Sequence, residues 1–260
     1  MKNINLTSLN AMKAAGEKFA VLTAYDASFA RLAELAGIEV VLVGDSLGNV
    51  VLGYDSTVPV TMDDMCHHTQ AVARGNNKSL IIADFPFMAY ASEFQALDNA
   101  AALMQAGAHM VKLEGGAWLE ETVLLLAERG IPVCAHLGLT PQSVHKLGGY
   151  RVQGKDDAAA TQILGDAVLL QEAGADLLVL ECVPTPLATQ ISQTLDIPVI
   201  GIGAGPGTDG QVLVLYDILG LSPRQPRFSK NFLAEAGSIQ GAMEAYATAV
   251  RTGCFPGPES

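Results

Sequence analysis

Eight short apolar runs recur along the chain, and helix-length segments separate most of them. The runs are nearly continuous in Val, Ile and Leu, which is typical of parallel strands that are covered on both faces. Alternating strands and helices on this scale predict a closed (βα)8 barrel, the TIM-barrel architecture, with a doubly wound open sheet as the alternative. The expected strands are residues 19–25, 39–45, 79–85, 109–115, 131–137, 176–182, 197–203 and 211–217.

The segments between these runs have the spacing of amphipathic helices, and Asp26 and Thr61 are suitable N-caps for the first two. A further short helix at residues 6–14 is expected to cover the bottom of the barrel. Only about seven residues separate the last two strands, whereas a parallel crossover needs about a dozen, so the seventh βα unit is expected to be shortened. The other helices are expected at residues 27–35, 62–74, 93–105, 119–128 and 158–172.

The length of 260 residues suits one barrel domain, and no linker or low-complexity tract divides it. We therefore expect residues 1–260 to form a single domain. Half of the residues are hydrophobic and only 16% are charged. Such a chain leaves apolar surface for further copies to cover, so a homo-oligomer is expected.

Charge and hydropathy limit the partners of this chain. A formal net charge of −12 repels phosphate backbones, which disfavours nucleic acid. The N-terminus lacks the apolar stretch of a signal peptide, and no apolar run reaches the roughly 18 residues that span a membrane. We therefore expect a cytoplasmic protein with no membrane partner.

None of its cysteines forms a CxxC pair, and reduced structural thiols are expected at Cys66, Cys134, Cys182 and Cys254.

Polar side chains collect at the carboxyl ends of the predicted strands, which meet around one mouth in a (βα)8 barrel. Each of them alone would be an ordinary start of a loop. Several carboxylates at the same depth in an apolar chain, however, are costly to bring together without a cation. The chain therefore predicts an active site at this mouth, built from Asp45, Ser46, Asp84, Lys112, Glu114, His136 and Glu181.

A hard divalent cation is the counter-charge that such acids favour, since oxygen ligands prefer Mg²⁺ or Mn²⁺ and the His and Cys spacings match no zinc site. We expect Asp45 and Asp84 to bind one Mg²⁺, with Glu114 as a ligand directly or through a water. An α-keto acid could chelate the ion through its carboxylate and keto oxygens. The metal would then polarise the carbonyl and stabilise an enolate.

Removal of the proton beside the carbonyl requires a base. Glu181 stands on a separate strand and is expected to face the substrate from the other side as that base. Lys112 is expected to pair with the substrate carboxylate or the enolate oxygen. A Schiff base on Lys112 is an alternative, disfavoured because nearby carboxylates keep the amine protonated.

Two loops and one glycine-rich stretch need separate interpretation. Residues 45–60 and 138–156 are long for βα loops and are candidate lids. Residues 201–205 read GIGAG, but they lack the strand–GxGxxG–helix context of a dinucleotide site. We therefore expect these glycines to serve packing or the close approach of substrate.

Long stretches of the chain resemble the ketopantoate hydroxymethyltransferase family, and the resemblance covers essentially the whole sequence. It is carried by TAYDASFA (23–30), VGDSLGNVVLGYDSTVPVTMDDM (43–65), ADFPFMAY (83–90), VKLEGG (111–116), HLGLTPQS (136–143), GGYRVQG (148–154), LECVP (180–184) and GIGAG with TDGQVLV (201–214). The resemblance implies a Mg²⁺-dependent, phosphoenolpyruvate/pyruvate-like barrel that assembles as a decamer of two stacked pentameric rings. It also implies transfer of a hydroxymethyl (one-carbon) unit from 5,10-methylenetetrahydrofolate to 3-methyl-2-oxobutanoate, giving 2-dehydropantoate in pantothenate biosynthesis.

The resemblance assigns roles by position. The family's metal- and substrate-binding aspartates match Asp45 and Asp84, its third metal-site acid matches Glu114, the residues that hold the keto acid match Ser46 and Lys112, the proton acceptor matches Glu181, and a pocket histidine at the substrate matches His136. The chain departs from the family's usual residues at three positions, which concern the packing of the lid and the folate contact. Asn49 replaces an apolar residue, commonly Met, Arg151 replaces Lys, and Tyr216 replaces His.

Two other functions stay open. A lyase or mutase of the related phosphoenolpyruvate/pyruvate barrel group would also bind keto acids or enolates on Mg²⁺. Those enzymes usually carry a catalytic cysteine in a lid loop, and residues 45–60 contain none. A non-catalytic binding protein could use the same fold, but the complete set of acids argues against it.

Overall fold

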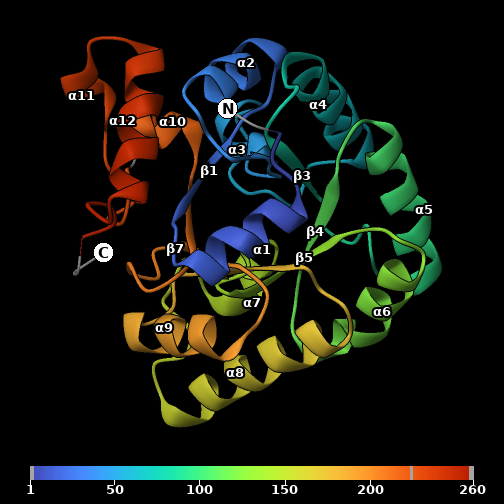
Figure 1. Cartoon of the computed structure of the whole chain (residues 1–260). Helices are drawn as coiled ribbons and strands as arrows, with labels where there is room; N and C mark the ends of the chain where they lie inside the picture. Colours follow the sequence, from blue (N-terminus) through green and yellow to red (C-terminus); the bar gives the residue numbers. More distant parts are fainter. Residues whose placement is uncertain (1–2, 223–224, 258–260) are drawn as a thin grey trace.

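The computed structural model describes residues 3–222 and 225–257. Eight parallel strands close into a barrel in chain order, and β8 pairs with β1 (Figure 1). The predicted (βα)8 barrel is therefore confirmed, and the open sheet is wrong. The strands are β1 (Phe19–Thr23), β2 (Val40–Val43), β3 (Leu80–Asp84), β4 (Met110–Glu114), β5 (Val133–Gly138), β6 (Leu177–Glu181), β7 (Val199–Ile202) and β8 (Gly210–Leu213).

Helices surround the barrel, and those predicted from the sequence begin and end within one or two residues of the expected bounds (Figure 1). The longer helices are α1 (Leu6–Ala15), α2 (Ala27–Leu35), α4 (Met62–Gly75), α5 (Glu93–Gln105), α6 (Glu120–Glu128), α8 (Asp157–Glu172), α9 (Thr185–Thr194) and α12 (Ile239–Arg251). Single turns form α3 (Leu47–Val50), α7 (Val144–Leu147), α10 (Leu215–Ile218) and α11 (Leu233–Ala236), and 3₁₀ turns form at Ala117–Leu119 and Pro141–Ser143.

Local capping explains where α2 and α4 begin. The Asp26 carboxylate accepts hydrogen bonds from the backbone N–H groups of Ser28 and Phe29, at 2.8 and 2.9 Å. Thr61 and Asp64 form a reciprocal capping box at the start of α4. Each cap satisfies backbone donors that the first turn leaves without a partner, so both predicted N-caps are confirmed.

Two apolar layers lie on the two faces of the barrel sheet. One fills the interior and includes Phe19, Val21 and Ile82. The other lies between the sheet and the helices and includes their strand neighbours Ala20 and Leu22. Alternate strand residues thus enter different layers, which is why the strands read as continuous apolar runs. Within the described ranges, no helix is long and apolar enough to cross a membrane.

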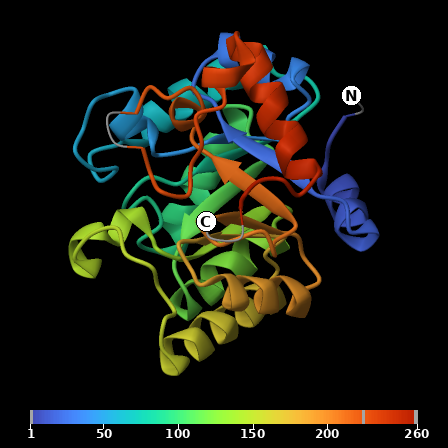
Figure 2. The ribbon, with the colours of Figure 1, turned by 90° about the vertical axis from the view of Figure 1, so that its left-hand side faces the viewer.

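The bottom of the barrel is closed by α1, as predicted. Leu9 of this helix is fully buried and packs into the interior layer, with Leu6 and Met12 at its margin. Figure 2 shows α1 at one end of the barrel, while the loops after β2 and β5 project at the other end. The open end is therefore the mouth at the carboxyl ends of the strands.

The chain between β7 and β8 is short, as predicted: residues 203–209, all of which the structure describes, contain no helix. The predicted eighth strand, however, is wrong beyond Leu213, because Leu215–Ile218 forms α10. The backbone N–H of Leu215 donates to Thr23 Oγ1 at 2.9 Å instead of continuing the ladder. Leu215 and Ile218 then pack into the outer apolar layer, so their hydrophobicity reflects helix packing.

Candidate active site

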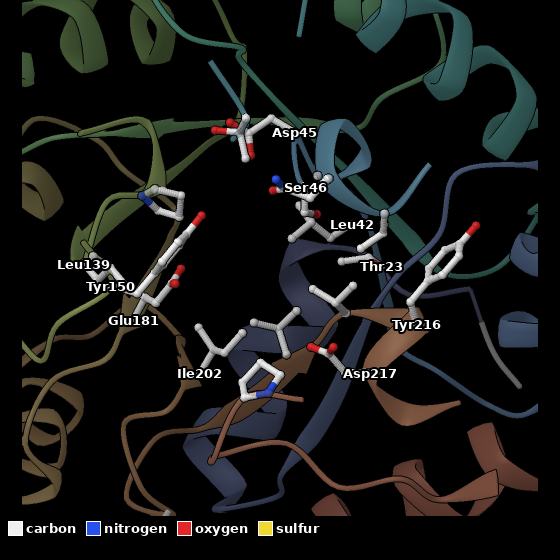
Figure 3. A pocket seen from close by; sticks show the side chains of 18 of the residues that line it. Thr23, Leu42, Asp45, Ser46, Leu139, Tyr150, Glu181, Ile202, Tyr216 and Asp217 are labelled. Atoms are coloured by element: carbon white, nitrogen blue, oxygen red, sulfur yellow. The ribbon is translucent and has the colours of Figure 1, made fainter. Parts of the chain in front are cut away.

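A cavity of about 1200 Å³ opens at the barrel mouth. Figure 3 shows Asp45 and Ser46 on one side of it and Glu181 with Tyr150 on another. Asp45 and Ser46 lie in the turn between β2 and α3, whereas the other predicted site residues lie on the strands themselves. All seven predicted residues line this one cavity: Asp45, Ser46, Asp84, Lys112, Glu114, His136 and Glu181.

Sheet register places Lys112 beside Asp84. The two residues pair between β3 and β4, and Lys112 Nζ lies 2.9 Å from Asp84 Oδ1. Burial alone lowers the pKa of Lys112, but Asp84, Glu114 and Asp45 outweigh it and raise the pKa well above its usual value. The side chain is therefore an ammonium at neutral pH, which disfavours the Schiff-base alternative.

Asp45 forms no ion pair with any described residue. Its backbone N–H donates to Asp84 Oδ2 at 3.1 Å, and the Asp45 carboxylate is almost fully buried. Burial, followed by the charges of Glu114 and Asp84, raises the pKa of Asp45 well above its usual value. Burial also raises the pKa of Asp84, although Lys112 opposes the shift. A cation placed between these two carboxylates would remove this penalty.

His136 lies between two glutamates. Its Nδ1 is 3.4 Å from Glu114 Oε1, and its Nε2 is 3.4 Å from Glu181 Oε2. Burial and Lys112 lower the pKa of His136, but the two carboxylates that it faces outweigh them and raise the pKa to about 9. Burial likewise raises the pKa of Glu114, yet His136 and Lys112 bring it below its usual value. His136 is therefore an imidazolium that balances part of the acid charge.

Gln142 joins the acids to the loop after β5, and reasoning from the sequence missed it. Its Nε2 donates to Asp45 Oδ2 at 2.9 Å and to the Phe85 carbonyl at 2.8 Å. Its backbone N–H donates to Glu114 Oε2 at 3.1 Å, and its Oε1 accepts from the Tyr90 hydroxyl at 2.6 Å. Gln142 is uncharged and lies in a 3₁₀ turn beyond a strand end, so no strand pattern marks it.

Ser46 is held at the cavity wall by an aromatic hydroxyl. The Tyr25 hydroxyl lies 2.9 Å from Ser46 Oγ, and burial raises the pKa of Tyr25 so that the phenol stays neutral. Gly44 leaves the space for this arrangement. A Cβ atom at Gly44 would lie 2.7 Å from Ser46 Oγ and 3.6 Å from Asp84 Oδ2. The glycine thus permits the close approach of the two side chains.

The two candidate lids contain short helical turns. Within residues 45–60, α3 is followed by a turn in which Asn49 Nδ2 donates to the Tyr54 carbonyl at 2.9 Å. Asn49, at a position where an apolar residue was expected, therefore stabilises this loop by a polar contact. Tyr54 and Tyr150 both line the cavity from these loops and are partly exposed. A closing motion of either loop stays a prediction.

The donor set suits a hard cation, although the protein does not form a complete cage for one. Across residues 3–222 and 225–257, no group of three His, Cys, Asp or Glu side chains is arranged to hold a metal ion. Mg²⁺ commonly takes only one or two carboxylates and completes its shell with water and substrate oxygens. The buried, charge-excess pair of Asp45 and Asp84 fits that mode of binding.

Comparison with known protein families gives a match that covers the whole barrel. The model of the ketopantoate hydroxymethyltransferase family matches residues 3–258. This chain belongs to that family. A relative from Saccharophagus degradans, named 3-methyl-2-oxobutanoate hydroxymethyltransferase, is 61% identical over 99% of this chain and 96% of its own. A relative of the same name from Photorhabdus laumondii is 57% identical over 100% and 98%.

Solved structures of more distant proteins share the fold. A phosphonopyruvate hydrolase, in complex with oxalate and Mg²⁺, superposes with a TM-score of 0.62 at 14% identity, over 81% of this chain and 80% of its own. A 2,3-dimethylmalate lyase of the PEP mutase/isocitrate lyase superfamily gives a TM-score of 0.57 at 20% identity, over 80% of each chain. These likenesses show that the (βα)8 barrel fold is shared with those proteins.

Proposed function

We propose that this chain transfers a hydroxymethyl unit from 5,10-methylenetetrahydrofolate to 3-methyl-2-oxobutanoate, forming 2-dehydropantoate and tetrahydrofolate. The observation that carries the proposal is the gathering of all seven family-matched side chains around one cavity. The names of the full-length relatives support the same reaction. The residues of the site have the charges that binding and deprotonating an α-keto acid require.

Asp45 and Asp84 would hold one Mg²⁺ at the mouth, and a cation bound there would polarise the keto carbonyl. Both oxygens of Glu114 already face protein groups, His136 Nδ1 and the backbone N–H of Gln142. Glu114 would therefore contact the Mg²⁺ through a water, which is one of the two modes of binding expected from the sequence. The ammonium of Lys112 and the hydroxyl of Ser46 would bind the carboxylate of the keto acid.

Glu181 is the proposed base. Its side chain lines the cavity on the side away from Asp45, and it keeps 15% of its surface exposed (Figure 3). It would take the proton from C3 of the keto acid, while His136 at 3.4 Å fixes its position. C3 would then bond to the methylene carbon of the folate. The C–N bonds to the folate break, water supplies the hydroxyl group, and the folate nitrogens receive the protons.

The cavity does not favour the cysteine-dependent lyase or mutase alternative. Among the residues that the structure describes, Cys182 is the cysteine that lines it. Burial, followed by the charge of Glu181, raises the pKa of this thiol to about 12. A thiol with such a pKa stays protonated and is a poor acid or nucleophile near neutral pH. Cleavage of a 2-hydroxy acid by the purified protein without folate would nevertheless favour the lyase.

The decisive experiment supplies purified protein with the keto acid, methylenetetrahydrofolate and Mg²⁺, and measures 2-dehydropantoate by mass spectrometry. We expect product that depends on all three additions, disappears with a chelator and returns with excess Mg²⁺. In heavy water without folate, the protein should still exchange the C3 proton of the keto acid. If the protein formed no product and exchanged no C3 proton, the proposal would be refuted.

A decamer is the proposed assembly. Large apolar side chains stay exposed around β3–α5 and β4–α6, among them Phe87, Met88, Phe94 and Trp118. A single copy gains nothing from exposing so much apolar surface, which supports burial between subunits.

A further inference from the structure

The cavity is larger than one small keto acid needs. Drug-sized ligands occupy pockets of roughly 300–1,000 Å³, and this cavity reaches about 1200 Å³. The side chains proposed to bind the keto acid come from β2 to β6. Much of the remaining wall comes from β7, β8, α10 and residues 221–222 and 225–228, and the proposed chemistry assigns it no role.

Asp217 of α10 is the acidic side chain of that wall among the described residues, and Arg227 also lines it. It is 5% exposed, and Figure 3 shows its carboxylate directed into the cavity on the side away from Asp45, while Tyr216 points elsewhere. Asp217 Oδ1 accepts a hydrogen bond from Ser222 Oγ at 2.5 Å. Among the described residues, Oδ2 has no hydrogen-bond donor and no cation pairs with the carboxylate. The carboxylate therefore keeps an acceptor oxygen that a ligand in the cavity could use.

We propose that Asp217 binds the pyrimidine edge of the tetrahydrofolate co-substrate. This inference rests on the proposed function. The N3–H and 2-amino groups of a reduced pterin are two parallel donors in one plane, which match the two oxygens of a carboxylate as a guanidinium does. Asp217 Oδ2 is available to one donor, and Oδ1 keeps a second lone pair beside Ser222 for the other.

The surroundings of Asp217 suit a flat ring. Ile202, Val212 and Val214 line the same cavity and provide apolar surface for the faces of a pterin. The transferred carbon is attached at the opposite end of the ring system from the pyrimidine edge. A folate held at Asp217 therefore directs that carbon back across the cavity, toward the side where Glu181 stands.

The test measures tetrahydrofolate binding directly, by anaerobic titration calorimetry in the presence of Mg²⁺. Asp217→Asn keeps the shape of the side chain but turns one acceptor into a donor. We expect tetrahydrofolate to bind this variant roughly 10- to 100-fold more weakly, the range for a hydrogen bond to a charged group. Exchange of the C3 proton of the keto acid should continue unchanged, which also shows that the variant is folded.

Two controls separate ligand binding from a structural role. Ser222→Ala removes the internal hydrogen bond of Asp217 but leaves its carboxylate, so it should weaken binding far less than Asp217→Asn. Asp98→Asn, on the exposed face of α5, makes the same change of charge away from the cavity and should bind tetrahydrofolate as the unaltered protein does. Equal losses in Asp217→Asn and Ser222→Ala would overturn the proposal.

A change in the ligand gives a second measurement. A tetrahydrofolate analogue with methyl in place of the 2-amino group should bind the unaltered protein more weakly than tetrahydrofolate. Asp217→Asn should cause little further loss with this analogue, because the interaction is already absent. If the unaltered protein binds both ligands equally, the inference fails even if the variant does not fold. If it exchanges no C3 proton and binds no tetrahydrofolate, the proposed function itself fails.

Discussion

Charge balance at the barrel mouth depends on a few buried side chains. Lys112 neutralises Asp84. His136 lies between Glu114 and Glu181, and these two carboxylates outweigh its burial and raise its pKa to about 9. Asp45 has no ion-pair partner in the ranges that the structure describes. One cation at Asp45 would complete the balance, which explains why the site suits a metal.

Removal of the proposed base should stop the reaction but leave the binding site intact. We expect Glu181→Gln to lower kcat by about 10²- to 10⁴-fold, since an amide cannot accept the C3 proton. The keto acid should still bind. The measurement is turnover together with C3 exchange in heavy water, with Glu121→Gln on the exposed face of α6 as the control. Turnover that is unchanged in the variant would show that another residue is the base. If the unaltered protein showed neither turnover nor exchange, the non-catalytic alternative would be revived.

Gln142 should affect the metal site through the residues that it positions. Gln142→Leu keeps most of the side-chain volume but removes the donors to Asp45 and the acceptor for Tyr90. We expect a higher Mg²⁺ concentration for half-maximal activity, because Asp45 loses the side-chain donor that orients it, whereas the backbone N–H that Glu114 accepts from is kept. Tyr90→Phe removes one of these hydrogen bonds and should have a smaller effect. A Mg²⁺ titration of Gln142→Leu that matched the unaltered protein would contradict this role.

The elements at the two ends of the barrel have different tasks. At the bottom, α1 contributes apolar packing, and at the mouth α10 contributes a carboxylate. Leu9→Ala should lower the free energy of unfolding by about 2–5 kcal/mol, because it leaves a cavity where a fully buried side chain packs.

Denaturant titration would measure that loss, with Asn10→Ala, which is exposed on the same helix, as the control. Activity at room temperature should persist in Leu9→Ala, since α1 lies at the end of the barrel away from the cavity (Figure 2). A loss of stability no larger than that of Asn10→Ala would show that α1 does not close the core.

The whole molecule should be a decamer of about 270 kDa, ten times the 27.2 kDa of one chain. Light scattering after size exclusion measures this mass directly. Phe94, which is 82% exposed on α5, is a test position: Phe94→Glu should shift the mass toward smaller species if it lies in a subunit interface. A 27.2 kDa particle at micromolar concentration would contradict the decamer.

The loops at the mouth mark the limit of what periodicity can predict. Asp26, Thr61 and the strand-end acids were predictable because capping and strand alternation are local rules. Gln142 and the Asp217 side chain were missed because each depends on contacts that no local pattern records. The error in the eighth strand has the same origin, since Leu215 bonds to Thr23, 192 residues away.

The sequence by itself determined the closed barrel, its shortened seventh unit and the seven side chains around the mouth. Apolar runs of fixed spacing can be buried only in a few ways, and the carboxyl ends of parallel strands must then meet. Only the tertiary structure decided how those charges balance and which loop residues complete the site. Gln142 reaches Asp45 across 97 residues of chain. Such contacts depend on the path of the loops. Many weak interactions across the whole fold together determine that path.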